Sequence, residues 1–195
     1  MSVYNTAVLS SLKKIKLEYN FDKFLNADYS IHSGSCLVHQ IKELSDVHEQ
    51  YGFGETYTIG NTTIRQLWWD NTEIDYEELG KQLEMEVVSV SSILQPPGNV
   101  IPLHRDTFFK IKQKYPNDDR LKVRANIYLE DWKVGHMIQY QDGNDWKNST
   151  HWKAGEGFLW SSDILHLSMN LYQKGCYQSL FWLNFYLKFE LRIKN

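Results

Sequence analysis

The chain has few cysteines, no long apolar segment and little excess charge. Its cysteines are Cys36 and Cys176, too few for a disulfide framework, which favours a reducing compartment. No segment has the roughly 18 apolar residues of a membrane span, and the N-terminus lacks the basic start and apolar run of a signal peptide. The net charge of −3 argues against general nucleic-acid binding. We therefore expect a cytoplasmic protein without membrane or nucleic-acid partners; the sequence indicates no oligomeric state.

The size and composition suit a single domain over residues 1–195, because 42% of the chain is hydrophobic and can fill one sizeable core. We expect this domain to have two parts. Residues 1–84 carry helical and irregular signals, with helices predicted over 36–52 and 75–86 from their apolar spacing. Residues 85–190 carry short strand signals. A helical start followed by many short strands is typical of a β-sandwich or barrel with helices packed outside.

Six segments are predicted to be strands from their alternation or their β-branched and aromatic content. Turn signals separate them, among them Pro96-Pro97-Gly98 and Asp142-Gly143. A short helix is expected over residues 107–115. The predicted strand segments are 87–94, 121–131, 136–141, 156–161, 165–172 and 177–191.

Several of these strands have one apolar and one polar face. In residues 165–172, for example, His166, Ser168 and Asn170 lie opposite a row of leucine and methionine residues. One possibility is that the polar faces lie in solvent. The other is a barrel with its polar faces inward, whose lumen would be lined by His166, Ser168, Asn170, Arg124, Asn126 and Gln178.

A His-x-Asp pair and a distant histidine are the main chemical signal of the chain. His104 and Asp106 lie two residues apart, and His166 follows on a later predicted strand. On a strand, residues two apart point the same way, so both can reach one metal ion. Two imidazoles and one carboxylate form the ligand set of non-haem iron centres, in which the opposite face of the metal stays open. The alternative is a surface His-Asp pair with an unrelated histidine in the lumen.

Three segments together resemble a known family. QPPGNVIPLHRD, VRANIYLEDW and HWKAGEGFLWSSDILHLSMN look like the iron(II)/2-oxoglutarate-dependent dioxygenases, and most of all like the aspartyl/asparaginyl β-hydroxylase-like branch. The resemblance covers about residues 85–187. It implies a mainly β fold with flanking helices, whose core is a double-stranded β-helix, the cupin-like jelly roll. It also implies that His104, Asp106 and His166 bind Fe(II), with 2-oxoglutarate as co-substrate and O2 as oxidant.

The chain departs from the family at one position. In the family, an arginine ten residues after the second histidine binds the far carboxylate of 2-oxoglutarate, and Cys176 stands here. A neutral thiol cannot form the bidentate ion pair of a guanidinium. Arg124 matches an arginine that touches the co-substrate in the β-hydroxylase branch, and Lys174 is a second candidate cation. Further candidate contacts to the co-substrate or to the metal ligands are Asn126, Ser168, Asn170 and Gln178.

The resemblance implies an enzyme that hydroxylates an amino-acid side chain, a peptide or a small metabolite. Cys176 leaves two alternatives open. One is a metal oxygenase that does not use 2-oxoglutarate, and the other is a non-catalytic jelly-roll protein that keeps the metal site or its surroundings.

Overall fold

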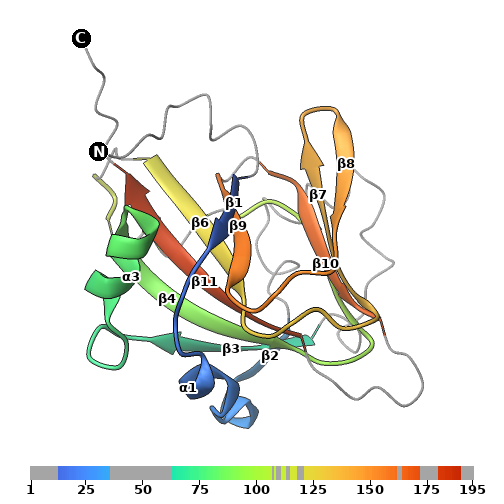
Figure 1. The fold of residues 1–195 in the computed structure, drawn as a ribbon, viewed down its shortest axis with the longest axis horizontal. Coiled ribbons are helices and arrows are strands. Elements are labelled where there is room, and N and C mark those ends of the chain that lie inside the picture. The colour runs from blue at the N-terminus through green and yellow to red at the C-terminus, as the bar shows by residue number, and fades with distance from the viewer. Residues whose placement is uncertain are drawn as a thin grey trace.

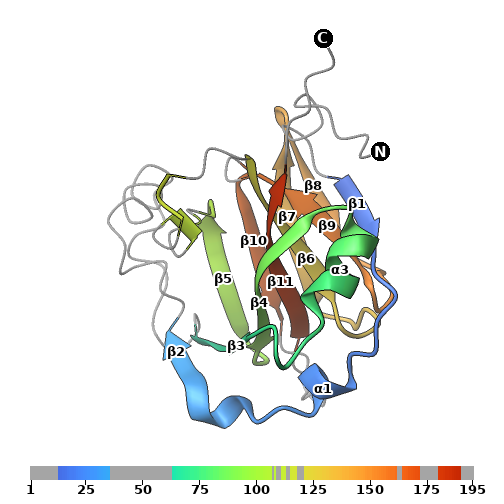
Figure 2. The same ribbon diagram turned by 90° about the vertical axis from the view of Figure 1, so that its left-hand side faces the viewer.

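Two antiparallel sheets form the main part of the described structure (Figure 1). The computed structural model describes residues 13–35, 63–106, 108, 111–112, 115–117, 121–161, 164–171 and 180–189. Figure 2 shows the two sheets as layers, with helix α3 (Tyr76–Leu83) on the outer side of one of them. None of the helices within these ranges is long and apolar enough to cross a membrane.

The larger sheet has seven strands, in the order β1-β9-β6-β11-β4-β3-β2. All its neighbouring strands are antiparallel. The strands are β1 (Lys13–Lys16), β2 (Ser33–Ser35), β3 (Thr63–Trp69), β4 (Glu86–Gln95), β6 (Leu121–Tyr128), β9 (Glu156–Trp160) and β11 (Leu180–Phe189).

The smaller sheet has four antiparallel strands, in the order β5-β10-β7-β8. From β4 onward the chain passes repeatedly from the larger sheet to the smaller one and back. This winding is the double-stranded β-helix, so the predicted jelly-roll core with flanking helices is confirmed. The strands of the smaller sheet are β5 (Asn99–His104), β7 (His136–Asp142), β8 (Asp145–Ser149) and β10 (His166–Asn170).

The predicted strand segments all contain strands, namely β4, β6, β7, β9, β10 and β11. The predicted turn at Asp142-Gly143 is also present, and joins β7 to β8 with Asp142 opposite Asp145. Strand β8 was missed, because its side chains are mostly exposed and carry no apolar alternation. Its pairing to β7 stabilises it instead, since the tight turn brings the two strands together.

The described residues of the N-terminal part form strands as well as helices. The helix expected over 75–86 is α3, which begins after Asp75, whose side chain accepts a hydrogen bond from the Glu78 backbone N–H. However, β1, β2 and β3 extend the larger sheet from this part, alongside the short helices α1 (Asp22–Leu25) and η2 (Tyr29–His32). The helix expected over 36–52 lies outside the described residues, as does most of the one expected over 107–115.

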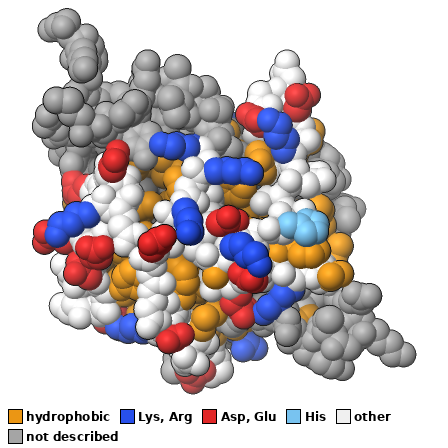
Figure 3. Space-filling model, in the orientation of Figure 1, with side chains coloured by type: hydrophobic (Ala, Val, Ile, Leu, Met, Phe, Trp, Pro, Cys, Tyr) orange, Lys and Arg blue, Asp and Glu red, His pale blue; other side chains and the backbone are white. Residues whose placement is uncertain are grey.

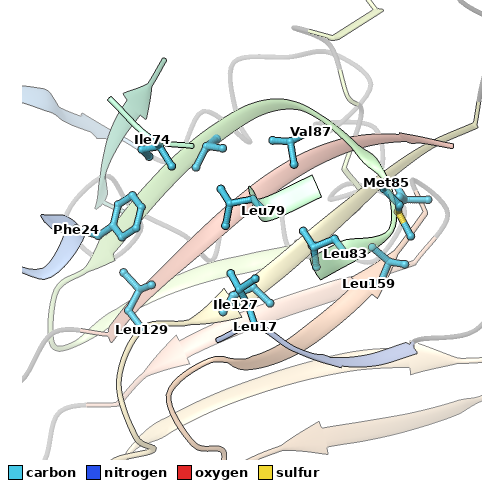
Figure 4. Packing of buried hydrophobic residues seen from close by; sticks show 13 residues of the cluster. Leu17, Phe24, Ile74, Leu79, Leu83, Met85, Val87, Ile127, Leu129 and Leu159 are labelled. Carbon is cyan, nitrogen blue, oxygen red and sulfur yellow. The ribbon is translucent and has the colours of Figure 1, made fainter. Parts of the chain in front are cut away.

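An outer core covers one face of the larger sheet. Figure 4 shows Leu79 and Leu83 of α3, together with Leu17 and Phe24, packed over this face. They meet side chains of β6 such as Ile127, all of them buried. The amphipathic pattern of α3 and the alternation of the strands therefore meet in one hydrophobic layer.

An inner core lies between the two sheets. It contains Ile93, Tyr128, Ile138, Phe158 and Trp160, drawn from both sheets. Strand β6 is therefore buried on both of its faces, with the outer core behind it and the interior of the barrel in front. Polar side chains on its inner face must find their partners inside the protein.

Candidate metal centre

The pairing of β5 with β10 brings the two histidines together. His104 is the last residue of β5 and His166 the first of β10, and the two are direct register partners. Their ring centroids lie 4.2 Å apart. Asp106 follows two residues after His104, beyond the end of the strand, so the expectation that both residues lie on one strand is wrong for Asp106. The antiparallel register thus unites residues that are far apart in the sequence.

The carboxylate of Asp106 lies between the two imidazoles. Its Oδ1 is 3.9 Å from His104 Nε2, and its Oδ2 is 3.8 Å from His166 Nε2. One ligand atom from each of the three residues lies within 4.8 Å of the others. All three residues are buried. This is the donor set expected from the sequence, gathered at one end of the barrel.

Backbone carbonyls fix the tautomers of both histidines. His104 Nδ1 is 2.7 Å from Pro102 O, and His166 Nδ1 is 3.0 Å from Ile164 O. A carbonyl oxygen only accepts hydrogen bonds, so in each ring Nδ1 donates and carries the proton. Each Nε2 then turns its lone pair toward Asp106, which is the arrangement that a metal-binding histidine adopts.

The protonation states also suit a metal. Burial lowers the pKa of His104 to about 3, with a further lowering from His166 and an opposing effect of Asp106. Burial likewise lowers the pKa of His166. Burial alone would raise the pKa of Asp106, but Arg124 and the two histidines lower it more, to about 2. At neutral pH the group therefore offers two neutral imidazoles and one carboxylate.

Two further side chains bind Asp106 from the larger sheet. Arg124 Nη1 donates a hydrogen bond to Oδ1, and Trp160 Nε1 donates one to Oδ2 at 2.8 Å. Arg124 on β6 and Trp160 on β9 are register partners. Arg124, a predicted co-substrate residue, is thus placed on the carboxylate of a candidate metal ligand.

The polar face of β10 points inward, as one of the two sequence alternatives predicted. His166, Ser168 and Asn170 are buried, whereas Leu171 is 51% exposed. Yet Ser168 and Asn170 form hydrogen bonds with Gln95. Ser168 Oγ donates to Gln95 Oε1 at 2.9 Å, and Asn170 Nδ2 donates to Gln95 O at 2.8 Å.

Gln95 forms several hydrogen bonds at the end of the barrel that lies away from the two histidines. Its Nε2 donates to Asn99 O at 2.7 Å, across the Pro-Pro-Gly turn that joins β4 to β5. It is fully buried. A buried polar face needs internal partners, and Gln95 supplies them for Ser168 and Asn170. These two residues therefore tie strands together at this end of the barrel.

The other predicted contacts divide into two groups. Asn126 lies two residues after Arg124 on the inner face of β6, and its Oδ1 is buried without a hydrogen-bond partner in the described part of the chain. Lys174, Cys176 and Gln178 lie outside the described residues.

Sequence reasoning missed Trp160 and Gln95. The alternation of residues 156–160 places Trp160 on the same face as Phe158. Its hydrogen bond to Asp106 follows from the register of β9 against β6 and from the fold of the loop after β5, neither of which leaves a sequence signal.

A cavity of about 380 Å³ lies elsewhere, between the edge of the larger sheet at β1 and the segment that follows β8. Tyr128, Trp152 and Phe158 form part of its wall, and none of the three candidate metal ligands lines it. The metal centre is therefore defined by the convergence of its side chains.

The chain resembles known proteins in its fold and not in its sequence. No protein-family model matches the chain, and no curated protein matches it. Among solved structures it is similar to a prolyl-4-hydroxylase from Pseudomonas putida, with a TM-score of 0.50 and 14% identity over 93% of this chain and 98% of that one. This likeness spans nearly the whole of both chains and supports the jelly-roll assignment.

Two further structures are less similar. The non-heme alpha ketoglutarate dependent epimerase SnoN from nogalamycin biosynthesis has a TM-score of 0.48 and 10% identity over 74% of this chain and 70% of that one. An oxidoreductase of the 2OG-Fe(II) oxygenase family from Burkholderia pseudomallei has a TM-score of 0.41 and 9% identity over 65% of each chain.

Proposed function

We propose that this protein is a non-haem iron(II)- and 2-oxoglutarate-dependent dioxygenase. The observation that carries the proposal is the buried convergence of His104, Asp106 and His166, with both Nε2 lone pairs turned toward the carboxylate. These three residues would hold the metal. The jelly-roll fold, which the chain shares with a prolyl-4-hydroxylase, supports the same class.

Bound iron would supply, with 2-oxoglutarate and O2, the oxidation of a substrate C–H bond. The chain's own residues bind and orient. The two imidazoles stay neutral, because burial lowers their pKa values. Asp106 stays ionised beside Arg124, which lowers its pKa. The inner core beside the centre, including the fully buried Trp160, excludes water.

The far carboxylate of 2-oxoglutarate needs a donor-rich partner. Among the described residues, Arg124 is a cation on the inner face of β6, and it is buried beside the candidate centre. Asn126 lies two residues further along that face, and its amide nitrogen carries N–H groups that can donate to a carboxylate. We propose that these two side chains contribute to the co-substrate site. Lys174 and Gln178 stay candidates from the sequence.

The substrate in this proposal is an amino-acid side chain, a peptide or a small metabolite. The motifs QPPGNVIPLHRD and HWKAGEGFLWSSDILHLSMN favour the aspartyl/asparaginyl β-hydroxylase-like branch. Figure 3 shows Lys and Arg side chains interspersed with Asp and Glu on the described surface of one face. Such a mixed surface supports a small-molecule or peptide substrate over a nucleic acid. We also propose a cytoplasmic location, because two cysteines are too few for a disulfide framework.

A second candidate is a jelly-roll metal-binding protein that does not turn over 2-oxoglutarate. Two observations favour it. Cys176 stands where the family has its co-substrate arginine, and the guanidinium of Arg124 is placed on Asp106.

The first test is succinate formation under air from purified protein, Fe(II) and 2-oxoglutarate, with a panel of amino acids and peptides. We expect succinate from the wild type and none above background from His104→Ala. His151→Ala is the matched control, because His151 is an exposed histidine that stacks on Trp132 away from the centre. Iron binding without succinate on any member of the panel would favour the second candidate.

A further inference from the structure

Both oxygens of Asp106 are held by the larger sheet, one by each of two neighbouring strands. Trp160 Nε1 donates to Oδ2 at 2.8 Å, and Arg124 Nη1 donates to Oδ1. Trp160 is 0% exposed, and Arg124 and Asp106 are also buried. The two donors are register partners on β9 and β6. The carboxylate therefore accepts hydrogen bonds from the larger sheet, whereas the two histidines belong to the smaller sheet.

These two hydrogen bonds fix the plane of the Asp106 carboxylate. A carboxylate group has about four acceptor positions, two on each oxygen. One position on each oxygen is taken by Trp160 or Arg124, and each oxygen also faces one imidazole nitrogen, at 3.9 Å for His104 and 3.8 Å for His166. Rotation of the Asp106 carboxylate would break both hydrogen bonds at once. The acceptor positions between the imidazoles are thereby held in place for a ligand.

The ring of Trp160 adds a second constraint. Its centroid lies 4.7 Å from that of His166, so one side chain touches both a histidine and the aspartate of the centre. Because Trp160 belongs to the inner core and is fully enclosed, it cannot move without repacking its neighbours. The indole is a rigid element between two candidate ligands.

We propose that Trp160 is a positioning residue of the metal centre, whose indole N–H sets the orientation of Asp106 and thereby the affinity and geometry of the bound metal. This inference rests on the proposed function, since it needs a metal at His104, Asp106 and His166. Partners of ligating side chains in metalloproteins typically contribute about 10- to 100-fold in metal affinity. Trp160 acts through Asp106 and does not touch the metal itself.

The chain offers a matched control. Trp69 is also on a strand of the larger sheet, and its Nε1 also donates to a side-chain oxygen, Ser92 Oγ, at 2.8 Å. It packs against the outer core instead of the inner one. Trp69→Phe and Trp160→Phe each remove an indole N–H donor and the same part of an indole, but only Trp160→Phe removes a hydrogen bond to Asp106. Trp69 is partly buried and Trp160 fully buried.

The experiment titrates metal-free protein with Co(II) and records both the dissociation constant and the visible absorption of the bound ion. Trp160→Phe should weaken Co(II) binding by about 10- to 100-fold and change the absorption spectrum. Trp69→Phe should leave both as in the wild type. Melting temperatures of the metal-free proteins are measured in parallel, so that a loss of stability is not taken for a loss of metal binding.

Replacement of Trp160 by 3-benzothienylalanine, which keeps the shape of the indole without the N–H, provides a second variant in case Trp160→Phe does not fold. Wild-type affinity and an unchanged spectrum in a folded protein with either replacement overturn the positioning role. A different result identifies failure of the proposed function: if the wild type binds Co(II) no better than His104→Ala does, there is no metal centre at these residues for Trp160 to position.

Discussion

His104 and His166 are direct partners across the β5–β10 pair, with their ring centroids 4.2 Å apart. Each ring is fixed by a carbonyl oxygen two residues earlier in its own strand or loop, at Pro102 and Ile164. The backbone therefore sets the tautomers before any ligand arrives. Asp106 completes the group, and its orientation depends on the opposite sheet.

Arg124 should stabilise the metal-free protein strongly. Removing one partner of a buried ion pair typically costs about 3–5 kcal/mol, and we expect Arg124→Met to lose stability in this range. The double variant Arg124→Met/Asp106→Leu should regain most of it, because no buried charge is left without a partner. Urea unfolding in the presence of a chelator measures both.

The control for this cycle is the exposed pair of Lys81 and Glu77, whose charged atoms lie 3.0 Å apart on the surface of α3. Lys81→Met should leave the urea midpoint almost unchanged, because solvent screens such pairs. An Arg124→Met variant that unfolds at the wild-type urea concentration would show that the contact with Asp106 contributes little.

The metal-free protein should lose stability as the pH falls below about 6.5. An unfolded histidine takes up a proton near that pH, whereas burial lowers the pKa of folded His104 to about 3. The unfolded state then binds more protons, so the free energy of unfolding falls by up to about 1.4 kcal/mol per pH unit for this group. His166 acts in the same direction, since burial lowers its pKa too.

Below about pH 4 the carboxyl of Asp106 extends the decline, because its folded pKa is lowered to about 2. Urea unfolding of metal-free wild type and His104→Gln at pH 7, 6 and 5 tests the histidine contribution. The variant should show the flatter profile, and two parallel profiles would count against it.

Gln95 should matter for stability and not for metal binding. Gln95→Met keeps the approximate size of the side chain but leaves Ser168 Oγ and Asn99 O without this partner. Each buried group deprived of its hydrogen bond costs about 1–3 kcal/mol, so the melting temperature should drop while Co(II) affinity stays at the wild-type value. Gln139→Met, which removes an exposed hydrogen bond to Asn148, is the control. Weakened binding of 2-oxoglutarate at unchanged stability would instead place Ser168 in the co-substrate site.

Gly157 should be intolerant of any side chain. A Cβ atom there would lie 2.0 Å from Asn126 O and 2.9 Å from Ile127 Cα, so β9 would have to move away from β6. We expect Gly157→Ala to lower both the melting temperature and the Co(II) affinity, because Trp160 lies on the displaced strand. Gly143→Ala is the control: its φ of 63° is strained for alanine, costing about 1–2 kcal/mol, but its Cβ would meet open space. Equal Co(II) affinities in all three proteins would show that β9 can shift without disturbing the centre.

Much of the jelly roll was predictable, because alternation is a local signal. The division of β10 and β6 into one apolar and one polar face followed from period-two patterns in short segments. That both polar faces point inward was one of two alternatives. Strand β8 was not predicted because it has no apolar face of its own. It is stabilised by its pairing with β7 and by the turn between the two strands. Strands β1 and β2 were not predicted because they are short and lie at the two edges of the larger sheet. Strand β3 lies inside the sheet, but its sequence TIRQLWW does not alternate strictly between apolar and polar residues.

The candidate ligands were predictable, but their surroundings were not. His104 and Asp106 form a sequence motif, and His166 occupies a strand with a clear face. By contrast, the roles of Trp160 and Arg124 depend on the β6–β9 register, and those of Ser168 and Asn170 depend on Gln95. Register and loop geometry are tertiary properties, so a residue's face could be inferred while its partner could not.

Strand β6 separates the outer core under α3 from the interior of the barrel. Ala125 and Ile127 point toward the hydrophobic layer under α3, while their immediate neighbours Arg124 and Asn126 lie on the inner face, where Arg124 contacts Asp106. The candidate metal centre and the folding stability thus depend on the same eight-residue strand. Evolution or engineering could therefore adjust the candidate metal centre through packing substitutions on the opposite face of this strand.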